Sequence, residues 1–197
     1  MTNIELVKQR ISESIAVKKK LLENDTLIST VSALADRIVD CIREGGKLVI
    51  CGNGGSASDA LHFAGEIVGR FARERQAWPA VVLNADVATM TAIANDYGYE
   101  EVFARQVEGQ IKKGDVFIGI STSGNSENVY RAQLKAKVLG ALTVCLAGKD
   151  GGKVANSADF SIVIPNDVTA RIQECHITII HILCELVESF LCDVDGH

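Results

Sequence analysis

The sequence lacks the features that mark nucleic-acid-binding, membrane and exported proteins. Its formal net charge is -5 and no basic cluster exceeds VKKK at 17–20, so it has no electrostatic footprint for nucleic acid or an anionic membrane. No apolar run approaches the roughly 20 residues of a membrane span. The amino-terminal stretch MTNIELVKQRIS does not build the apolar core of a signal peptide. We therefore expect a cytoplasmic protein with neither a membrane nor a nucleic acid as partner.

Aromatic residues, proline and paired cysteines are also scarce. Of the 197 residues 5% are aromatic and 2 are proline, and the six cysteines form no C-x-x-C motif. The cysteines lie among aliphatic residues, which is typical of small buried side chains in a reducing compartment. Hydrophobic residues nevertheless make up 47% of the chain. This composition indicates strands that are buried on both faces and favours an α/β architecture.

Hydrophobic periodicity predicts two amino-terminal helices followed by alternating strands and helices. Residues 4–44 have helical periodicity, with a break and a cap at ENDT, residues 23–26. Short apolar runs follow at 47–51, 80–84, 116–120, 142–146 and 160–164. Each of the first four precedes a helix-like or capped segment, which is the rhythm of a parallel sheet. The helix after Pro165 is apolar on nearly all sides, so we expect it to pack on two sides.

These patterns predict one α/β domain over residues 1–197. Its expected form is a three-layer sandwich around a five-stranded parallel sheet with flavodoxin-like strand order. The first of the two helices predicted in residues 1–45 has little of the predicted domain to pack against. We interpret residues 1–45 as a helical arm for oligomerisation.

Two loops that are poor in bulky side chains follow the first and third predicted strands. CGNGGSASDA, residues 51–60, offers bare backbone that a ligand can approach closely. ISTSGNSENV, residues 120–129, offers hydroxyls and a helix start capped by Asn125 or Ser126, which suits an anion. In a flavodoxin-like sheet the first and third strands are neighbours, so both loops open into one crevice. We expect a small phosphorylated ligand there.

The first loop also matches the dinucleotide pattern G-x-G-x-x-A at Gly52, Gly54 and Ala57. That pattern usually places an acidic residue about 20 residues further on, at the end of the second strand. Here this distance falls on RERQ, residues 73–76, before the second strand begins. A nucleotide would also leave the serine-rich loop unexplained, so a dinucleotide ranks well below a phosphorylated small molecule.

Several proton-active side chains follow these loops. His62 and Glu66 lie four residues apart on one helix face, and the pair suits metal binding, general acid–base work or an ordinary surface contact. Gln173 and His181 lie eight residues apart on the last helix, about 12 Å along its axis. One ion could bind both only if the helix bends or if two subunits contribute, and His181 could instead be a core histidine. Asn95 and Asp96 could cap a helix, the simpler explanation, or reach the crevice.

Several segments, taken in order, resemble the phosphoheptose isomerase family of sugar isomerase (SIS) domain proteins. They are GNGGSASDALHFAGEIVGRF, IANDYGYEEVF, GISTSGNSENV, AGKDGGK and TARIQECHITIIH, and the resemblance runs from about Lys47 to the end of the last helix. It implies a SIS fold and a homotetrameric aldose–ketose isomerase. The implied reaction converts sedoheptulose 7-phosphate to glycero-manno-heptose 7-phosphate for the heptose of lipopolysaccharide or related glycans.

The resemblance also implies roles for individual residues. It places one zinc ion on His62, Glu66, Gln173 and His181, in sites shared between subunits, with Glu66 and His181 as catalytic acid and base. Some members have an aspartate where this chain has Ala170, which puts one sugar contact in doubt. The implied substrate residues are Asn53, Gly54, Gly55, Asn95, Asp96, Ser121, Thr122, Ser123, Ser126 and Gln173.

Two other functions remain open at this point. The DnaA initiator-associating protein resembles this chain at the same His, Glu, Gln and His positions, yet acts as a tetrameric binding partner in replication initiation. A SIS sugar-phosphate sensor would bind ligand without turnover. These residues therefore discriminate poorly between enzyme and binding protein.

Overall fold

Five parallel strands form the central sheet in the order β2-β1-β3-β4-β5. The computed structural model describes residues 1–194. The strands are β1 (Leu48–Gly52), β2 (Ala80–Val82), β3 (Val116–Ser121), β4 (Leu142–Gly148) and β5 (Phe160–Ile164). Each overlaps one of the predicted apolar runs, and the order confirms the flavodoxin-like sheet. The first and third strands are neighbours, paired from Leu48 with Val116 to Gly52 with Ile120.

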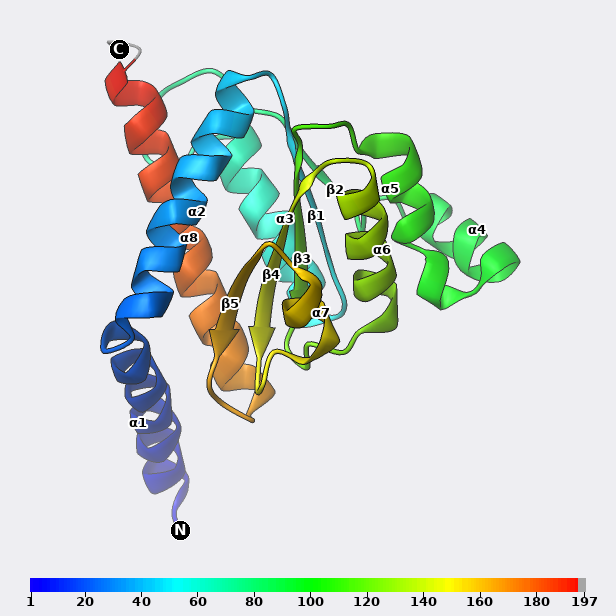
Figure 1. Ribbon diagram of the computed structural model, residues 1–197. Helices are drawn as coiled ribbons and strands as arrows, with labels where there is room; N and C mark the ends of the chain where they lie inside the picture. Colours follow the sequence, from blue (N-terminus) through cyan, green and yellow to red (C-terminus); the bar gives the residue numbers. More distant parts are fainter. Residues whose placement is uncertain (195–197) are drawn as a thin grey trace.

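Helices cover both faces of this sheet, which confirms the three-layer sandwich (Figure 1). One layer consists of α2 (Asp25–Arg43), α3 (Gly55–Val68) and α8 (Thr169–Val194). The other consists of α4 (Val87–Tyr97), α5 (Ala104–Gln110), α6 (Glu127–Val138) and α7 (Gly152–Ser157), with the 3-10 helix η1 (Tyr99–Glu101) beside α4. Successive side chains of a strand point to opposite faces of the sheet, so each strand packs against both layers. In β1, Leu48 and Ile50 pack toward the first layer, and Val49 and Cys51 pack toward the second.

The amino-terminal helix α1 (Asn3–Leu22) is joined to α2 at the predicted break. Asn24 caps α2 by accepting a hydrogen bond from the Leu27 backbone N–H. Only Val17 and Leu21 of α1 are buried, and the helix extends beyond the sandwich (Figure 1). An apolar stripe on α1 is exposed, formed by Ile4, Val7, Ile11 and Ile15.

The last helix, α8, is the main core helix of the first layer. Its segment Thr169–Asp193 is long and apolar enough to cross a membrane, with mean hydropathy 1.6, so the expectation that no segment approaches this length was wrong. Ile172, Ile180 and Leu183 are nevertheless fully buried against the rest of the chain. Packing within the fold therefore accounts for one face of α8, whereas Ile182 and Phe190 stay exposed, so the expected packing on a second side is not seen within the chain.

Candidate active site

The glycine loop and the serine-rich loop meet at the carboxyl ends of β1 and β3. Asn53, which follows β1, donates its side-chain amide to Asn128 Oδ1 at 2.9 Å, and Asn128 donates back to Asn53 Oδ1 at 3.0 Å. Asn128 lies in the first turn of α6 and is 3% exposed. This reciprocal pair confirms that the two loops lie side by side, as the strand order predicted; their junction is the expected crevice.

The glycine loop admits a close neighbour because it has no side chains in the way. Gly54 has φ 56°, a conformation that favours glycine. A Cβ on Gly55 would lie 2.3 Å from the amide nitrogen of Gln173, so that side chain rests directly on the Gly55 backbone. The helix α3 begins at Gly55, and no side chain caps it. Its first backbone N–H groups are left without a capping side chain.

Hydroxyl groups gather in the serine-rich loop between β3 and α6. Ser121 Oγ lies 2.9 Å from Ser126 Oγ and 3.5 Å from Ser123 Oγ. Ser126, not Asn125, is the residue before α6, and its hydroxyl makes no capping bond to the helix. Thr122 lies in the same turn. Three hydroxyls and an uncapped helix start thus converge, which is an arrangement that binds anions.

A second loop supports the serine-rich loop from behind. The backbone N–H of Val154 donates to Gly124 O at 2.9 Å. Gly124 has φ 67°, and a Cβ there would lie 2.0 Å from Gly151 O. The segment AGKDGGK, residues 147–153, therefore fixes the path of the serine-rich loop through backbone contacts that only glycine permits.

His62, Glu66 and His181 form a compact cluster between α3 and α8. His62 Nε2 lies 3.0 Å from Glu66 Oε1 and 3.3 Å from His181 Nε2. One ligand atom from each residue lies within 4.8 Å of the other two. The side chain of His62 is 45% exposed and that of Glu66 is 23% exposed. The sequence-predicted trio is therefore brought together within one chain and remains accessible, so His181 is not an isolated core histidine.

Gln173 lies at a different position along the α3–α8 pair from the cluster. α3 and α8 run side by side in parallel: Gln173 meets Gly55, His181 meets His62, and Glu188 meets Phe71. Gly55 precedes His62 by seven residues, which is about 10 Å along a helix axis. Gln173 therefore lies at the crevice end of the pair, whereas the cluster lies further along.

Asp59 adds a titratable group one turn before His62. Burial raises the pKa of its carboxyl to about 6, although the nearby His62 partly offsets this. Its Oδ2 atom is buried and has no hydrogen-bond partner within residues 1–194. Nothing in the sequence distinguishes Asp59, because an aspartate in the first turns of a helix is ordinary.

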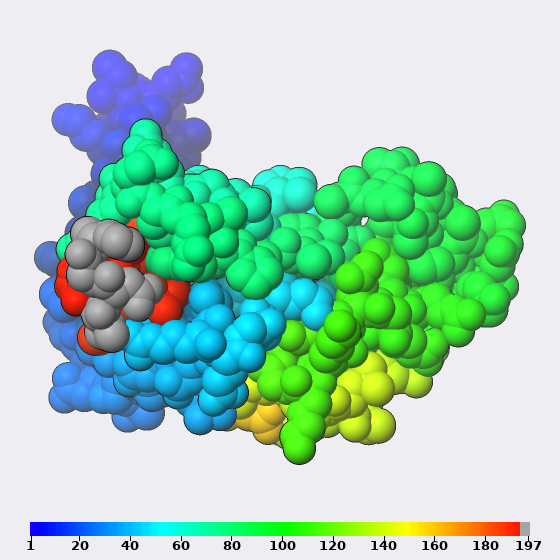
Figure 2. Space-filling model, turned by 90° about the horizontal axis from the view of Figure 1, so that it is seen from above, coloured from blue at the N-terminus to red at the C-terminus, as the bar shows by residue number. Residues whose placement is uncertain are grey.

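Asn95 and Asp96 cap no helix in the structure, so capping was the wrong explanation for them. Both lie in the last turn of α4, which is capped by Asp86 and Gly98. They are exposed, and the side-chain amide of Asn95 donates to Asp96 Oδ1. Figure 2 shows the region of α4 and α5 projecting from the body of the molecule.

Three further polar residues organise the crevice and were missed from the sequence. Tyr99 donates its hydroxyl to Asn53 Oδ1 at 3.0 Å, and Asn128 pairs with the same amide. Asn84 exchanges hydrogen bonds with the Gly52 backbone. Tyr99 and Asn128 lie inside the segments IANDYGYEEVF and GISTSGNSENV, which is the one signal that could have drawn attention to them.

Comparison with known proteins places the chain in a family. The family model described as the SIS domain matches residues 11–148. A phosphoheptose isomerase of Aquifex aeolicus is 48% identical over 96% of this chain and 98% of that protein. One of Helicobacter pylori strain P12 is 51% identical over 92% of this chain and 93% of that protein.

Solved structures agree. A phosphoheptose isomerase from Neisseria gonorrhoeae superposes with a TM-score of 0.90 at 40% identity, covering 95% of this chain and all of that one. Another from Francisella tularensis gives 0.91 at 35% identity, covering 96% of this chain and all of that one. The chain therefore belongs to the phosphoheptose isomerase family of SIS-domain proteins.

Proposed function

We propose that the chain converts sedoheptulose 7-phosphate to glycero-manno-heptose 7-phosphate, an aldose–ketose isomerisation that supplies heptose for lipopolysaccharide or related glycans. The observation that carries this proposal is the accessible cluster of His62, Glu66 and His181, on helices that both begin at the crevice. The family relationship favours this enzyme over the DnaA-associating partner and the sensor. The cluster alone does not separate the enzyme from the DnaA-associating protein, which has the same residue types at these positions, so this choice rests on the family relationship.

The serine-rich loop is the proposed phosphate site, through Ser121, Thr122, Ser123 and Ser126. The convergence of their loop on the start of α6 supports this role. The remaining proposed contacts are to the sugar, from Asn53, Gly54, Gly55, Asn95, Asp96 and Gln173. The contacts of Asn53 with Asn128 and of Gln173 with Gly55 support those at the crevice. For Asn95 and Asp96 the support is the family resemblance alone.

The chemistry requires one proton to move between adjacent carbons through an enediol. We assign Glu66 as the base that removes the proton from one carbon and returns it to the next. Its Oε1 is engaged by His62, whereas its Oε2 has no hydrogen-bond partner among the described residues. One oxygen can thus hold the side chain in place while the other handles the proton. We assign His181 to ring opening and to proton transfer at the sugar oxygens.

The cluster also fits a zinc ion. Two imidazoles and a carboxylate are common zinc ligands, and their ligand atoms lie within 4.8 Å of one another. A neutral imidazole nitrogen carries at most one proton, so His62 Nε2 cannot serve both neighbours equally well, and a shared cation would satisfy all three. His62, Glu66 and His181 would hold the ion, and Gln173 would complete the set. When bound, zinc would polarise the substrate oxygens.

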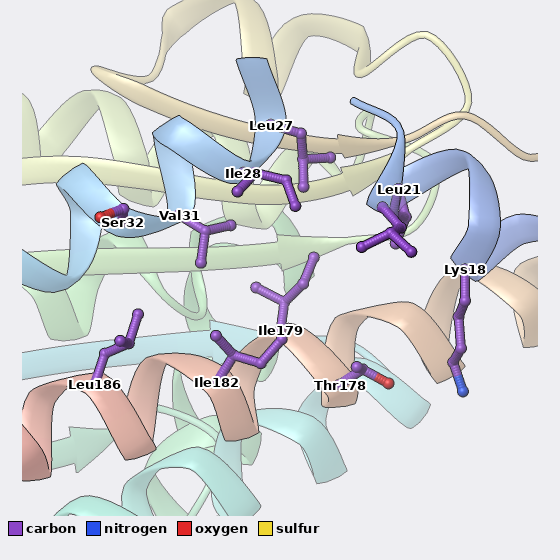
Figure 3. A pocket seen from close by; sticks show the side chains of 11 residues that line it. Lys18, Leu21, Leu27, Ile28, Val31, Ser32, Thr178, Ile179, Ile182 and Leu186 are labelled. Carbon is purple, nitrogen blue, oxygen red and sulfur yellow. The ribbon is translucent and has the colours of Figure 1, made fainter. Parts of the chain in front are cut away.

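The position of Gln173 along α8, away from the cluster, supports a site that is shared between subunits. Within one chain its amide lies at Gly55 and not in the cluster, so we infer that a neighbouring subunit of a homotetramer brings the fourth ligand. Apolar surface is available for this assembly. A cavity of about 420 Å³ lies between α1, α2 and α8, with Leu21, Ile28 and Ile182 in its lining (Figure 3). We propose that residues 1–45 serve as an assembly arm of a single SIS domain, 1–197, in the cytoplasm.

Incubating the purified protein with sedoheptulose 7-phosphate, with and without added zinc, tests the proposed function. Formation of the aldose heptose 7-phosphate, followed by NMR, is the expected result. Binding of the sugar phosphate without turnover in either condition would favour the sensor. If the protein neither binds nor converts the sugar phosphate, the remaining alternative is a binding partner of another protein.

A further inference from the structure

A buried ion pair lies at the far end of the α3–α8 helix pair from the crevice. Arg75 Nε donates to Glu188 Oε1 at 3.0 Å, and their side chains are 5% and 3% exposed. Arg75 belongs to the segment 69–79 that joins α3 to β2, and Glu188 lies on α8 two turns after His181. In Figure 2 the chain after α3 lies beside the carboxyl end of α8. Neither residue has a role in the proposed chemistry.

Glu188 holds the segment after α3 by its backbone. It accepts hydrogen bonds from the N–H groups of Phe71, Ala72 and Arg73 at 2.8–3.0 Å. Burial alone would raise the pKa of this carboxyl, but these donors and Arg75 bring it below the ordinary value, which favours the charged form. The charged Glu188 carboxylate, with four donors, therefore holds residues 71–73 of this segment against α8.

Arg75 holds the carboxyl end of α3 in the same way. Its Nη2 donates to the backbone carbonyl of Glu66 at 2.8 Å, and its Nη1 donates to that of Ile67 at 3.0 Å. The guanidinium also stacks on the ring of Trp78 with its central carbon 3.5 Å from the ring centroid. One planar side chain therefore joins the backbone of Glu66 to Glu188 on α8.

The segment after α3 also contacts the other half of the cluster. The ring of Phe71, whose N–H is held by Glu188, lies against the His181 imidazole with centroids 6.0 Å apart. We propose that Arg75 and Glu188 are a positioning pair that sets the separation of α3 and α8 and thereby the geometry of His62, Glu66 and His181. The expected effect on turnover rests on the proposed function, whereas the effect on geometry does not.

The chemistry of a buried ion pair favours a positioning role for Arg75 and Glu188 over simple stabilisation of the fold. Desolvating two charges is costly, and buried ion pairs can often be replaced by apolar residues without loss of stability. Apolar replacements cannot reproduce the directional bonds to the Glu66 carbonyl and to the three N–H groups. Small misplacements of catalytic groups, about 1 Å, can lower turnover by roughly 100-fold.

Two single variants and a matched control test the pair. Arg75→Lys keeps the charge but loses the planar fork, and Glu188→Gln keeps the size but loses the charge. Asp115→Asn is the control, because Asp115 is equally buried and likewise accepts backbone N–H groups, from Lys47 and Lys112, together with the Lys47 ammonium. It precedes β3, at the amino ends of the strands, whereas the crevice lies at their carboxyl ends.

We expect both test variants to lower kcat by about 10- to 100-fold with KM changed less than about 3-fold, because the phosphate loop is untouched. Zinc affinity should fall by about 10-fold, as it does when groups supporting metal ligands are lost. Trp78 is the only tryptophan, so its emission should shift in Glu188→Gln, where Arg75 remains. Asp115→Asn should change none of these.

Folded variants with wild-type kcat, zinc affinity and Trp78 emission would overturn the proposal, as would an equal loss in Asp115→Asn. If a single variant fails to fold, the double variant Arg75→Met with Glu188→Leu replaces it. This variant should fold yet show the same losses, and wild-type properties in it would also overturn the proposal. Should the wild type show no isomerase turnover, zinc affinity and Trp78 emission still decide the matter.

Discussion

The proposed role of Glu66 requires one side chain that is held in place and still acts on a carbon-bound proton. Its Oε1 is bound by His62 and its backbone carbonyl accepts from Arg75, so both ends of the residue are fixed. The second carboxylate oxygen remains for chemistry. At the scale of single residues, the proposed mechanism requires that one carboxylate oxygen holds the side chain while the other handles the proton.

Replacing Glu66 with Gln tests this division. The amide keeps the size of the side chain but cannot take up a proton, so turnover should fall by about 100- to 10,000-fold. Binding of the sugar phosphate, measured by calorimetry, should persist because the serine-rich loop is unchanged. Glu185→Gln, the same chemical change at an exposed glutamate of α8, is a control that should keep full activity. Wild-type turnover in Glu66→Gln would show that another residue is the base.

His176 gives a prediction about stability and pH. It is fully buried and its Nε2 lies 3.0 Å from Ala147 O, and burial lowers its pKa from 6.5 to about 4. Below pH 6.5 the unfolded chain therefore takes up a proton that the folded chain refuses until about pH 4. This residue should lower the free energy of unfolding by roughly 2 kcal/mol between pH 7 and pH 5.

Urea unfolding of the parent and of His176→Gln at both pH values isolates this contribution. Glutamine does not titrate, so the variant should lose less stability between pH 7 and pH 5 than the parent does. Other groups, such as Asp59, contribute equally to both proteins and cancel in the comparison. An identical pH dependence of the two proteins would contradict the assignment.

At the scale of elements, the loops and the α3–α8 pair place the chemistry. Parallel strands bring the glycine loop and the serine-rich loop to one edge, where Asn53 and Asn128 join them. The helices that leave this edge then carry Gln173 at the crevice and His181 further along. The position of each residue along its helix thus sets its distance from the crevice, and this separates the proposed phosphate site from the proposed site of proton transfer.

Gly124→Ala tests the support of the serine-rich loop. A Cβ there would lie 2.0 Å from Gly151 O in a backbone region that disfavours alanine. We expect a loss of about 1–3 kcal/mol in stability and a raised KM with a smaller change in kcat. Gly109→Ala in α5 is the matched control, since a Cβ there meets nothing within 4 Å. Thermal unfolding and steady-state kinetics measure both effects, and an unperturbed Gly124→Ala protein would argue against a rigid loop.

The strands and most helices could be predicted from sequence because their signals are local. Each apolar run became a strand, and ENDT marked the junction of α1 and α2. The polar contacts could not be predicted in the same way. Tyr99 and Asn128 meet Asn53 across 46 and 75 residues of sequence, and Arg75 meets Glu188 across 113. Such pairs exist only after the sheet has brought distant loops together, so no local pattern indicates them.

At the scale of the whole molecule, exposed apolar surface supports the proposed assembly. α1 presents Ile4, Val7, Ile11 and Ile15 to solvent, and the cavity between α1, α2 and α8 has a mostly apolar lining. Extensive exposed apolar surface is uncommon on a monomer. The proposed sharing of Gln173 between subunits gives this assembly a catalytic consequence.

The double variant Ile11→Glu, Ile15→Glu tests this link. Charges on the stripe should disrupt subunit contacts, so sedimentation should show smaller species with unchanged helix content. Turnover should fall with the loss of the oligomer, because each site would lack its contribution from a neighbour. Lys8→Glu, on the same helix, controls for added negative charge. An active monomer would contradict the shared site.

The central claim is tested most directly by measuring turnover of sedoheptulose 7-phosphate by the wild-type protein and by Glu66→Gln, side by side with zinc present. The account predicts that NMR detects the aldose heptose 7-phosphate with the wild type and that the variant forms it at least about 100 times more slowly. Absence of product from the folded, sugar-phosphate-binding wild type would contradict the account.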